Sequence, residues 1–150
     1  MSLTPPFPAD VLYKKQKNGY YALHYFNPIA SDSRPRCCSY IRVSSRQQSN
    51  DDKHSLPEQW RLNWEAAEKQ GYAVVVIYIE VLSGSSRYRK AYQQMLADGR
   101  AGKFKAIFAT MNDRLFRSMW SAADLEEMIE QHSIELFGSV EPIDKELLGL

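Results

Sequence analysis

From residue 37 onward, short apolar segments alternate with longer segments of helical periodicity, and this alternation constrains the fold most strongly. The predicted strands lie near residues 37–43, 74–80, 105–111 and 134–139. The predicted helices lie near residues 55–70, 87–101 and 117–132. Parallel strands joined through helices of this length need right-handed crossovers, which place helices on both faces of the sheet. We therefore predict an α/β domain of three layers (helices, sheet, helices), with a largely parallel central sheet of about four to five strands.

The pattern within these segments indicates how the core is built. The predicted strand at 74–80 is apolar almost throughout, as expected for a strand that is covered on both faces. Trp60 and Trp64 are one helical turn apart, so both are predicted to lie in the core or an interface. Gly71 follows the first predicted helix at the position where a left-handed cap is favoured.

Residues 1–36 differ from the rest of the chain, and we interpret them as an N-terminal extension and linker. They are rich in proline, and Asn18-Gly19 between two aromatic segments predicts a small hairpin. Lysines interleaved with tyrosines there would also suit a nucleic-acid-binding arm. Residues 37–150 form the second region; with 150 residues and 44% hydrophobic content, the chain can bury one sizeable core.

Net charge, cysteine content and the absence of long apolar runs bear on the partners and the cellular location of the protein. The net charge is only +1, so any nucleic-acid partner must be held by local clusters of arginine. Cys37 and Cys38 are neighbours in a predicted strand and point to opposite faces, so we expect two reduced thiols. Neither a signal peptide nor an apolar run near the ~18 residues of a membrane span is evident, which predicts a cytoplasmic protein with no membrane partner.

Polar side chains collect after each of the first three predicted strands. The groups are Ser44, Ser45, Arg46 and Gln48; Glu80, Ser83, Arg87 and Arg89; and Asn112, Asp113, Arg114 and Arg117. The carboxyl ends of parallel strands share one edge of a sheet, so these groups should surround one crevice. Guanidinium groups match phosphate oxygens, which predicts a phosphate substrate. A serine hydroxyl among these arginines is then a candidate nucleophile toward phosphorus.

Other phosphate and hydrolase chemistries fit less well. The three histidines lie away from the predicted strand ends, which disfavours a Ser-His-Asp hydrolase. No phosphate loop or dinucleotide-binding turn follows the first strand, which counts against a nucleotide-binding or phosphatase-like protein. A two-metal nuclease would need several converging carboxylates, and only Glu80 and Asp113 are suitably placed.

Three blocks of these residues resemble the signature blocks of the serine recombinases, the resolvase/invertase family. The blocks are Tyr40-Ile41-Arg42-Val43-Ser44 with Gln48, Ser83-Gly84-Ser85-Ser86 with Arg89, and Asp113-Arg114-Leu115-Phe116-Arg117. The resemblance spans about residues 37–144 and implies a resolvase-like fold. Ser55-Leu56-x-x-Gln59, before the first predicted helix, is most similar to the large and transposon-encoded members.

The resemblance implies site-specific DNA recombination without a metal or nucleotide cofactor. Ser44 would attack a phosphodiester and form a 5′-phosphoserine link, and Ser45 is its local rival. The resemblance assigns phosphate binding to Arg42, Arg89, Arg114 and Arg117, and proton handling or site orientation to Asp113. It assigns supporting roles to Gln48, Ser83 and Tyr40, and DNA contacts to Arg46 and Arg87.

The same resemblance implies the partners and the setting. We expect double-stranded DNA as the substrate, homodimers that assemble to a tetramer on it, and no small-molecule substrate. The implied setting is a prokaryotic cell, at the nucleoid, with the gene on a mobile element. We expect the chain to stop before the family's long dimerisation helix and DNA-binding domain. The alternative is a catalytically incomplete remnant that acts as an interaction or regulatory protein.

Overall fold

A computed structural model describes most of the chain. The described residues are 4–8, 10–17, 19–27, 31–44, 55–82, 89–110 and 122–140, without the side chains of residues 44, 122 and 123. The strands are β1 (Lys14–Gln16), β2 (Gly19–Tyr25), β3 (Arg36–Ser44), β4 (Ala73–Leu82), β5 (Ala106–Ala109) and β6 (Glu135–Gly138). The helices are α1 (Leu56–Gln70), α2 (Lys90–Arg100) and α4 (Ala122–His132).

The strands form one sheet in the order β1-β2-β4-β3-β5-β6. β4, β3, β5 and β6 are parallel neighbours, which confirms the predicted largely parallel α/β sheet. β2 pairs antiparallel with β4, and β1 pairs antiparallel with β2. The described sheet therefore has six strands and not four to five, because residues 14–25 add an antiparallel ribbon to the edge of β4.

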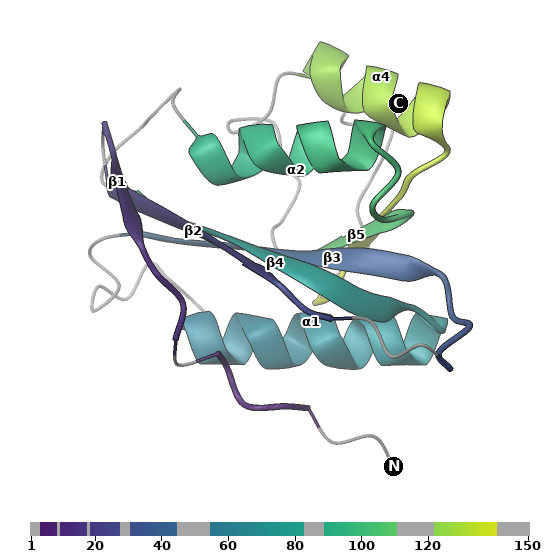
Figure 1. The fold of residues 1–150 in the computed structure, drawn as a ribbon, viewed down its shortest axis with the longest axis horizontal. Helices are drawn as coiled ribbons and strands as arrows, with labels where there is room; N and C mark the ends of the chain where they lie inside the picture. Colours follow the sequence, from purple (N-terminus) through teal and green to yellow (C-terminus); the bar gives the residue numbers. More distant parts are fainter. Residues whose placement is uncertain are drawn as a thin grey trace.

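Helices cover both faces of the sheet, giving the predicted three layers (Figure 1). α1 lies on one face, and α2 and α4 lie on the other. From Val76 onward the side chains of β4 alternate between the two cores, as a period of two requires: Ile77 and Ile79 join the cluster under α1, whereas Val76 and Tyr78 join the cluster under α2 and α4. No helix in the described ranges is long and apolar enough to cross a membrane.

Helix α1 begins and ends where its sequence indicates. The Ser55 side chain accepts a hydrogen bond from the Glu58 backbone N–H, and Gly71 ends the helix with φ 82°. Trp60 is 1% exposed, as predicted for a core residue, and its ring stacks on Phe26 at 5.5 Å. Its indole N–H donates to the carbonyl of Pro5 at 2.8 Å, so residues near the N-terminus also pack on α1.

The adjacent cysteines are buried free thiols, as predicted. Cys37 belongs to the core cluster under α1 and Cys38 to the cluster under α2 and α4, so their side chains lie on opposite faces. Burial raises the pKa of both thiols, which keeps them protonated and unreactive at neutral pH.

Candidate active site at the carboxyl edge of the sheet

The carboxyl ends of β3 and β4 lie at one edge of the sheet, together with those predicted site residues that the structure describes. Ser44 is the last residue of β3, and its strand partner on β4 is Leu82. Leu82 pairs in turn with Gly19, the first residue of β2. Because neighbouring strands are spaced by about 4.8 Å, the backbones of Ser44 and Gly19 lie roughly 10 Å apart. The ribbon made by β1 and β2 thus borders the position of the predicted nucleophile.

Arg42 is held close to this edge by its backbone. Its carbonyl accepts a hydrogen bond at 3.0 Å from Nε2 of Gln59, whose Oε1 accepts one at 2.9 Å from the Thr110 hydroxyl. Gln59 therefore ties α1 to β3 and to the residue that follows β5. The Arg42 side chain is half-buried, and its Nε is a buried donor with no hydrogen-bond partner among the described residues. An anion at this edge would supply the missing acceptor.

Glu80 is the strand neighbour of Arg42 and is 0% exposed. Its Oε1 accepts a hydrogen bond from the Tyr92 backbone N–H at 2.9 Å, and its Oε2 accepts one from Nε2 of Gln16 at 2.7 Å. Burial raises the pKa of Glu80, although these hydrogen bonds and the charge of Arg89 act in the opposite direction. The buried carboxyl group thus joins β4 to α2 and to β1 by hydrogen bonds.

Arg89 occupies the position just before the first turn of α2 and is only 9% exposed. Burial lowers its pKa, and the charge of Arg42 lowers it further, whereas Tyr40 and Glu80 favour the charged form. The Arg89 guanidinium therefore interacts with the charges of both Arg42 and Glu80, at the positive end of α2. This excess of positive charge in a partly desolvated edge favours the binding of an anion such as a phosphate.

Tyr40 lies beneath the arginines in the core. It is 0% exposed, and its ring meets that of Tyr92 edge to face at 6.4 Å. Burial raises the pKa of its phenol well above the ordinary value, and the nearby Glu80 charge adds to the increase. A neutral, packed phenol of this kind supports the site from below.

The described residues contain only part of the predicted site. They bring together Arg42, Arg89, Tyr40 and the backbone of Ser44. The other predicted site residues lie outside the described ranges: Arg46, Gln48, Ser83, Arg87, Asp113, Arg114 and Arg117. Their placement stays a prediction from the sequence.

Two glutamines at this edge were not predicted to have a role. Gln59 stands out only as a polar residue on the buried side of α1, a turn before the buried Asn63. Gln16 lies in a strand of three residues whose other two side chains are exposed, so no periodic pattern marks it as buried. Both are nearly fully buried, and both use their amides to join separate elements.

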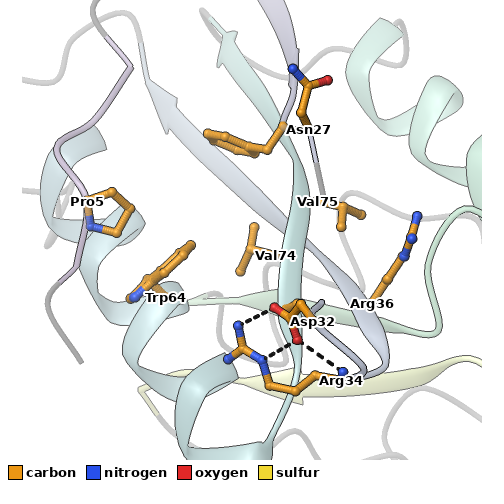
Figure 2. A pocket seen from close by; sticks show the side chains of 10 residues that line it. Pro5, Asn27, Asp32, Arg34, Arg36, Trp64, Val74 and Val75 are labelled. Carbon is orange, nitrogen blue, oxygen red and sulfur yellow. Dashed lines mark hydrogen bonds and ion pairs between the residues drawn. The ribbon is translucent and has the colours of Figure 1, made fainter. Parts of the chain in front are cut away.

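A separate cavity of about 190 Å³ lies at the opposite edge, where β3 and β4 begin (Figure 2). Its walls include Phe26 and Trp64, together with Arg36. Arg34 lies at one side of the cavity and pairs with Asp32 at 2.8 Å. None of the predicted site residues lines this cavity, so it is distinct from the arginine-rich edge.

Comparisons with known proteins agree with this architecture. A family model described as the N-terminal domain of resolvase matches residues 37–146. The fold is similar to the crystal structure of the N-terminal catalytic domain of TP901-1 integrase, with a TM-score of 0.55 and 23% identity over 74% of this chain and 82% of that one. No protein of curated function matches the sequence.

A second solved structure carries the same indication. It is the C-terminal catalytic domain of ISC1926 TnpA, described as an IS607-like serine recombinase, with a TM-score of 0.55 and 25% identity over 69% of this chain and 70% of that one. The family match covers most of the chain and all three sequence blocks, and so confirms the resemblance. The chain belongs to the resolvase family of serine recombinases, which carry out site-specific recombination of DNA.

Proposed function

We propose that this chain is a recombinase catalytic domain that breaks and rejoins DNA through a 5′-phosphoserine intermediate on Ser44. The Ser44 hydroxyl gives up its proton as its oxygen forms a bond to phosphorus, the bond from phosphorus to the 3′ oxygen breaks, and the leaving 3′ oxygen takes up a proton, so no net proton is consumed. Rejoining reverses these steps with a 3′-hydroxyl from another end. The ester keeps the energy of the broken phosphodiester, so no nucleotide cofactor takes part.

The observation that carries this proposal is the electrostatic state of the edge beside the end of β3. Arg89 lies within electrostatic range of Arg42 and of the buried Glu80 carboxyl group, and Nε of Arg42 has no hydrogen-bond partner among the described residues. The first N–H groups of α2 are already accepted by Gln16 and Glu80, so the helix contributes its positive dipole and not free donors. A phosphodiester placed there would satisfy the unpaired donor and balance the charge. Arginines fixed before the reaction can also stabilise the extra negative charge of the transition state.

The remaining assignments follow from the family resemblance. Arg114 and Arg117 would complete the phosphate-binding set, and Asp113 would orient the site or handle protons. Gln48, Ser83 and Tyr40 would support the site. Arg46 and Arg87 would contact DNA. Each role requires the loops after β3, β4 and β5 to meet at the carboxyl edge, as parallel strands require.

The proposed partner is double-stranded DNA, bound by homodimers that assemble to a tetramer. Local arginines, and not the net charge of +1, would provide the attraction to the DNA backbone. A cytoplasmic location at the nucleoid and a mobile genetic element as the source belong to the same proposal.

The test is to trap the covalent intermediate. The full chain is fused to the dimerisation helix and DNA-binding module of a recombinase of known site, and incubated with nicked crossover DNA that cannot be rejoined. We expect a denaturation-resistant protein–DNA band that Ser44→Ala abolishes and Ser45→Ala retains. If no band forms while the fusion is folded and bound to its site, the proposed function is wrong.

A further inference from the structure

The ribbon of β1 and β2 lies outside residues 37–146, the segment matched by the family model, yet it reaches the proposed active site. β2 runs antiparallel along β4 from Gly19 opposite Leu82 to Tyr25 opposite Val76. This pairing places β1 beside the end of the sheet where α2 begins (Figure 1). The sequence that precedes the family domain is therefore in direct contact with elements that carry site residues.

Gln16, the last residue of β1, makes this contact with a fully used amide. Its Nε2 donates to Oε2 of Glu80 at 2.7 Å and to the carbonyl of Tyr20 at 3.1 Å. Its Oε1 accepts from the Lys90 backbone N–H at 3.0 Å. Both donor bonds end on oxygens and the acceptor bond begins at an N–H, so the hydrogen-bond network fixes the orientation of the amide.

The contact supplies what the start of α2 lacks. The first N–H groups of a helix have no acceptor within the helix, and the residue before α2, Arg89, does not cap it with its side chain. Gln16 instead accepts the N–H of Lys90, and Glu80 accepts the N–H of Tyr92. The cap of α2 is thus shared between β1 and β4, and Gln16 also holds the carboxyl group of Glu80 in place.

We propose that Gln16 is a positioning residue for DNA cleavage, which holds the first turn of α2, and with it Arg89, at the phosphate-binding edge. This inference rests on the proposed function. Arg89 directly precedes Lys90, so any shift of the first turn moves the backbone from which its guanidinium extends. Misplacing a reacting or charge-stabilising group by about 1 Å can lower a rate by roughly 100-fold.

The chemistry of the amide separates this role from simple packing. Gln16→Met keeps length and apolar volume but removes all three hydrogen bonds. Gln16→Glu keeps an acceptor for the Lys90 N–H but sets a second carboxylate against Glu80. Combining Gln16→Glu with Glu80→Gln restores a donor and acceptor pair between the two positions. Gln93→Met makes the same change at an exposed position of α2 and serves as the control.

The first measurement uses the 150-residue chain alone and does not depend on activity. Amide hydrogen exchange of Gln16→Met should be faster at Lys90 by about tenfold, the factor expected for losing one hydrogen bond of ordinary net strength. Exchange at Met95, in the middle of α2, should keep its wild-type rate. Unchanged exchange at Lys90, or equal acceleration at both amides, would overturn the inference whether or not the chain cleaves DNA.

The second measurement is single-turnover cleavage by the fusion described above. We expect Gln16→Met and Gln16→Glu to lower the cleavage rate by about 10- to 100-fold with DNA affinity unchanged, and the double variant to recover part of the loss. Gln93→Met should cleave at the wild-type rate. Wild-type cleavage by Gln16→Met would overturn the positioning role. Absence of cleavage by the wild-type fusion would instead count against the proposed function and leave the exchange result to decide this inference.

Discussion

Arg42 on β3 and Glu80 on β4 are direct neighbours in the parallel ladder, yet both carboxylate oxygens of Glu80 accept hydrogen bonds from other elements. Gln16 and the first turn of α2 occupy the carboxylate, and Nε of Arg42 stays without a hydrogen-bond partner among the described residues. Both oxygens of the Glu80 carboxylate are thus used within the fold, and the proposed function gives the Arg42 donor an anionic ligand.

Replacement of Arg42 should reduce cleavage far more than DNA binding by the fusion. Loss of one fixed donor to the transition state typically costs about 10²–10³ in rate, so we expect that decrease for Arg42→Ala. Arg42→Lys should recover only part of it, because an ammonium group cannot form the planar double contact of a guanidinium. Arg61→Ala is the control, since Arg61 pairs with Glu65 on the exposed side of α1. Equal rates for Arg42→Ala and Arg61→Ala would contradict this role.

Gln59 should stabilise the fold as well as the site. Gln59→Met leaves the buried carbonyl of Arg42 and the hydroxyl of Thr110 without their present partner. We expect the free energy of unfolding to fall by about 1–3 kcal/mol, measured by urea denaturation. Gln93→Met, at an exposed position of α2, provides the matched control and should change stability little. A Gln59→Met protein as stable as Gln93→Met would show that these hydrogen bonds contribute nothing net.

Asp98 should make stability depend on pH in the acidic range. Burial alone would raise its pKa, but hydrogen bonds from Tyr25, Tyr78 and Gln94 hold the pKa below the ordinary value. A lowered pKa in the folded state means that the carboxylate stabilises the fold above its unfolded pKa of about 3.9. This contribution disappears as the pH falls through the folded-state pKa.

The measurement compares the wild-type protein with Asp98→Asn in urea from neutral pH down to acid. The stability difference between them should be largest near pH 7 and shrink as the carboxylate of the wild-type protein becomes protonated. Glu127→Gln, which removes an exposed carboxylate of α4, controls for the change in net charge. A difference between wild type and Asp98→Asn that is constant with pH would contradict the assignment.

Gly19 should be required for the ribbon to dock on β4. Its φ is 145°, and a Cβ atom there would collide with the backbone carbonyl of Val81. Gly19→Ala should therefore destabilise the protein by about 1–3 kcal/mol and accelerate amide exchange more in β2 than in β5. Gly71 also has an unfavourable φ of 82°, but a Cβ atom there would meet open space. Gly71→Ala should therefore leave the rate of amide exchange in β2 unchanged relative to β5. Unchanged amide exchange of β2 in Gly19→Ala would contradict the close approach of Gly19 to the Val81 backbone.

Much of the fold could be predicted from the sequence because its signals are local. Apolar runs and helical periodicity mark β3, β4 and α1 to within a few residues, and the spacing of Trp60 on α1 marks it as core. The order of strands and the edge that collects polar residues follow from the rules for parallel crossovers. The arginines Arg42 and Arg89 were therefore predicted to share one edge, and the structure places both there.

The attachment of the ribbon could not be predicted, because it depends on contacts between distant parts of the chain. A hairpin at residues 14–25 is a local feature, but its antiparallel pairing with β4 is decided by which sheet edge is open once the core has formed. The burial of Gln16 follows from that pairing and from Glu80 and Lys90, more than 60 residues away. Propensity and periodicity contain no information about such a contact.

The central claim is that Ser44 becomes covalently joined to DNA, and mass spectrometry of the trapped adduct tests it most directly. The adduct from nicked crossover DNA would be digested with nuclease and protease, and the peptide that spans Tyr40 to Gln48 sequenced by fragmentation. We predict a 5′-linked nucleotide phosphate on Ser44. A nucleotide on Ser45, on a residue outside this peptide, or on no residue although DNA is cleaved, would contradict the account.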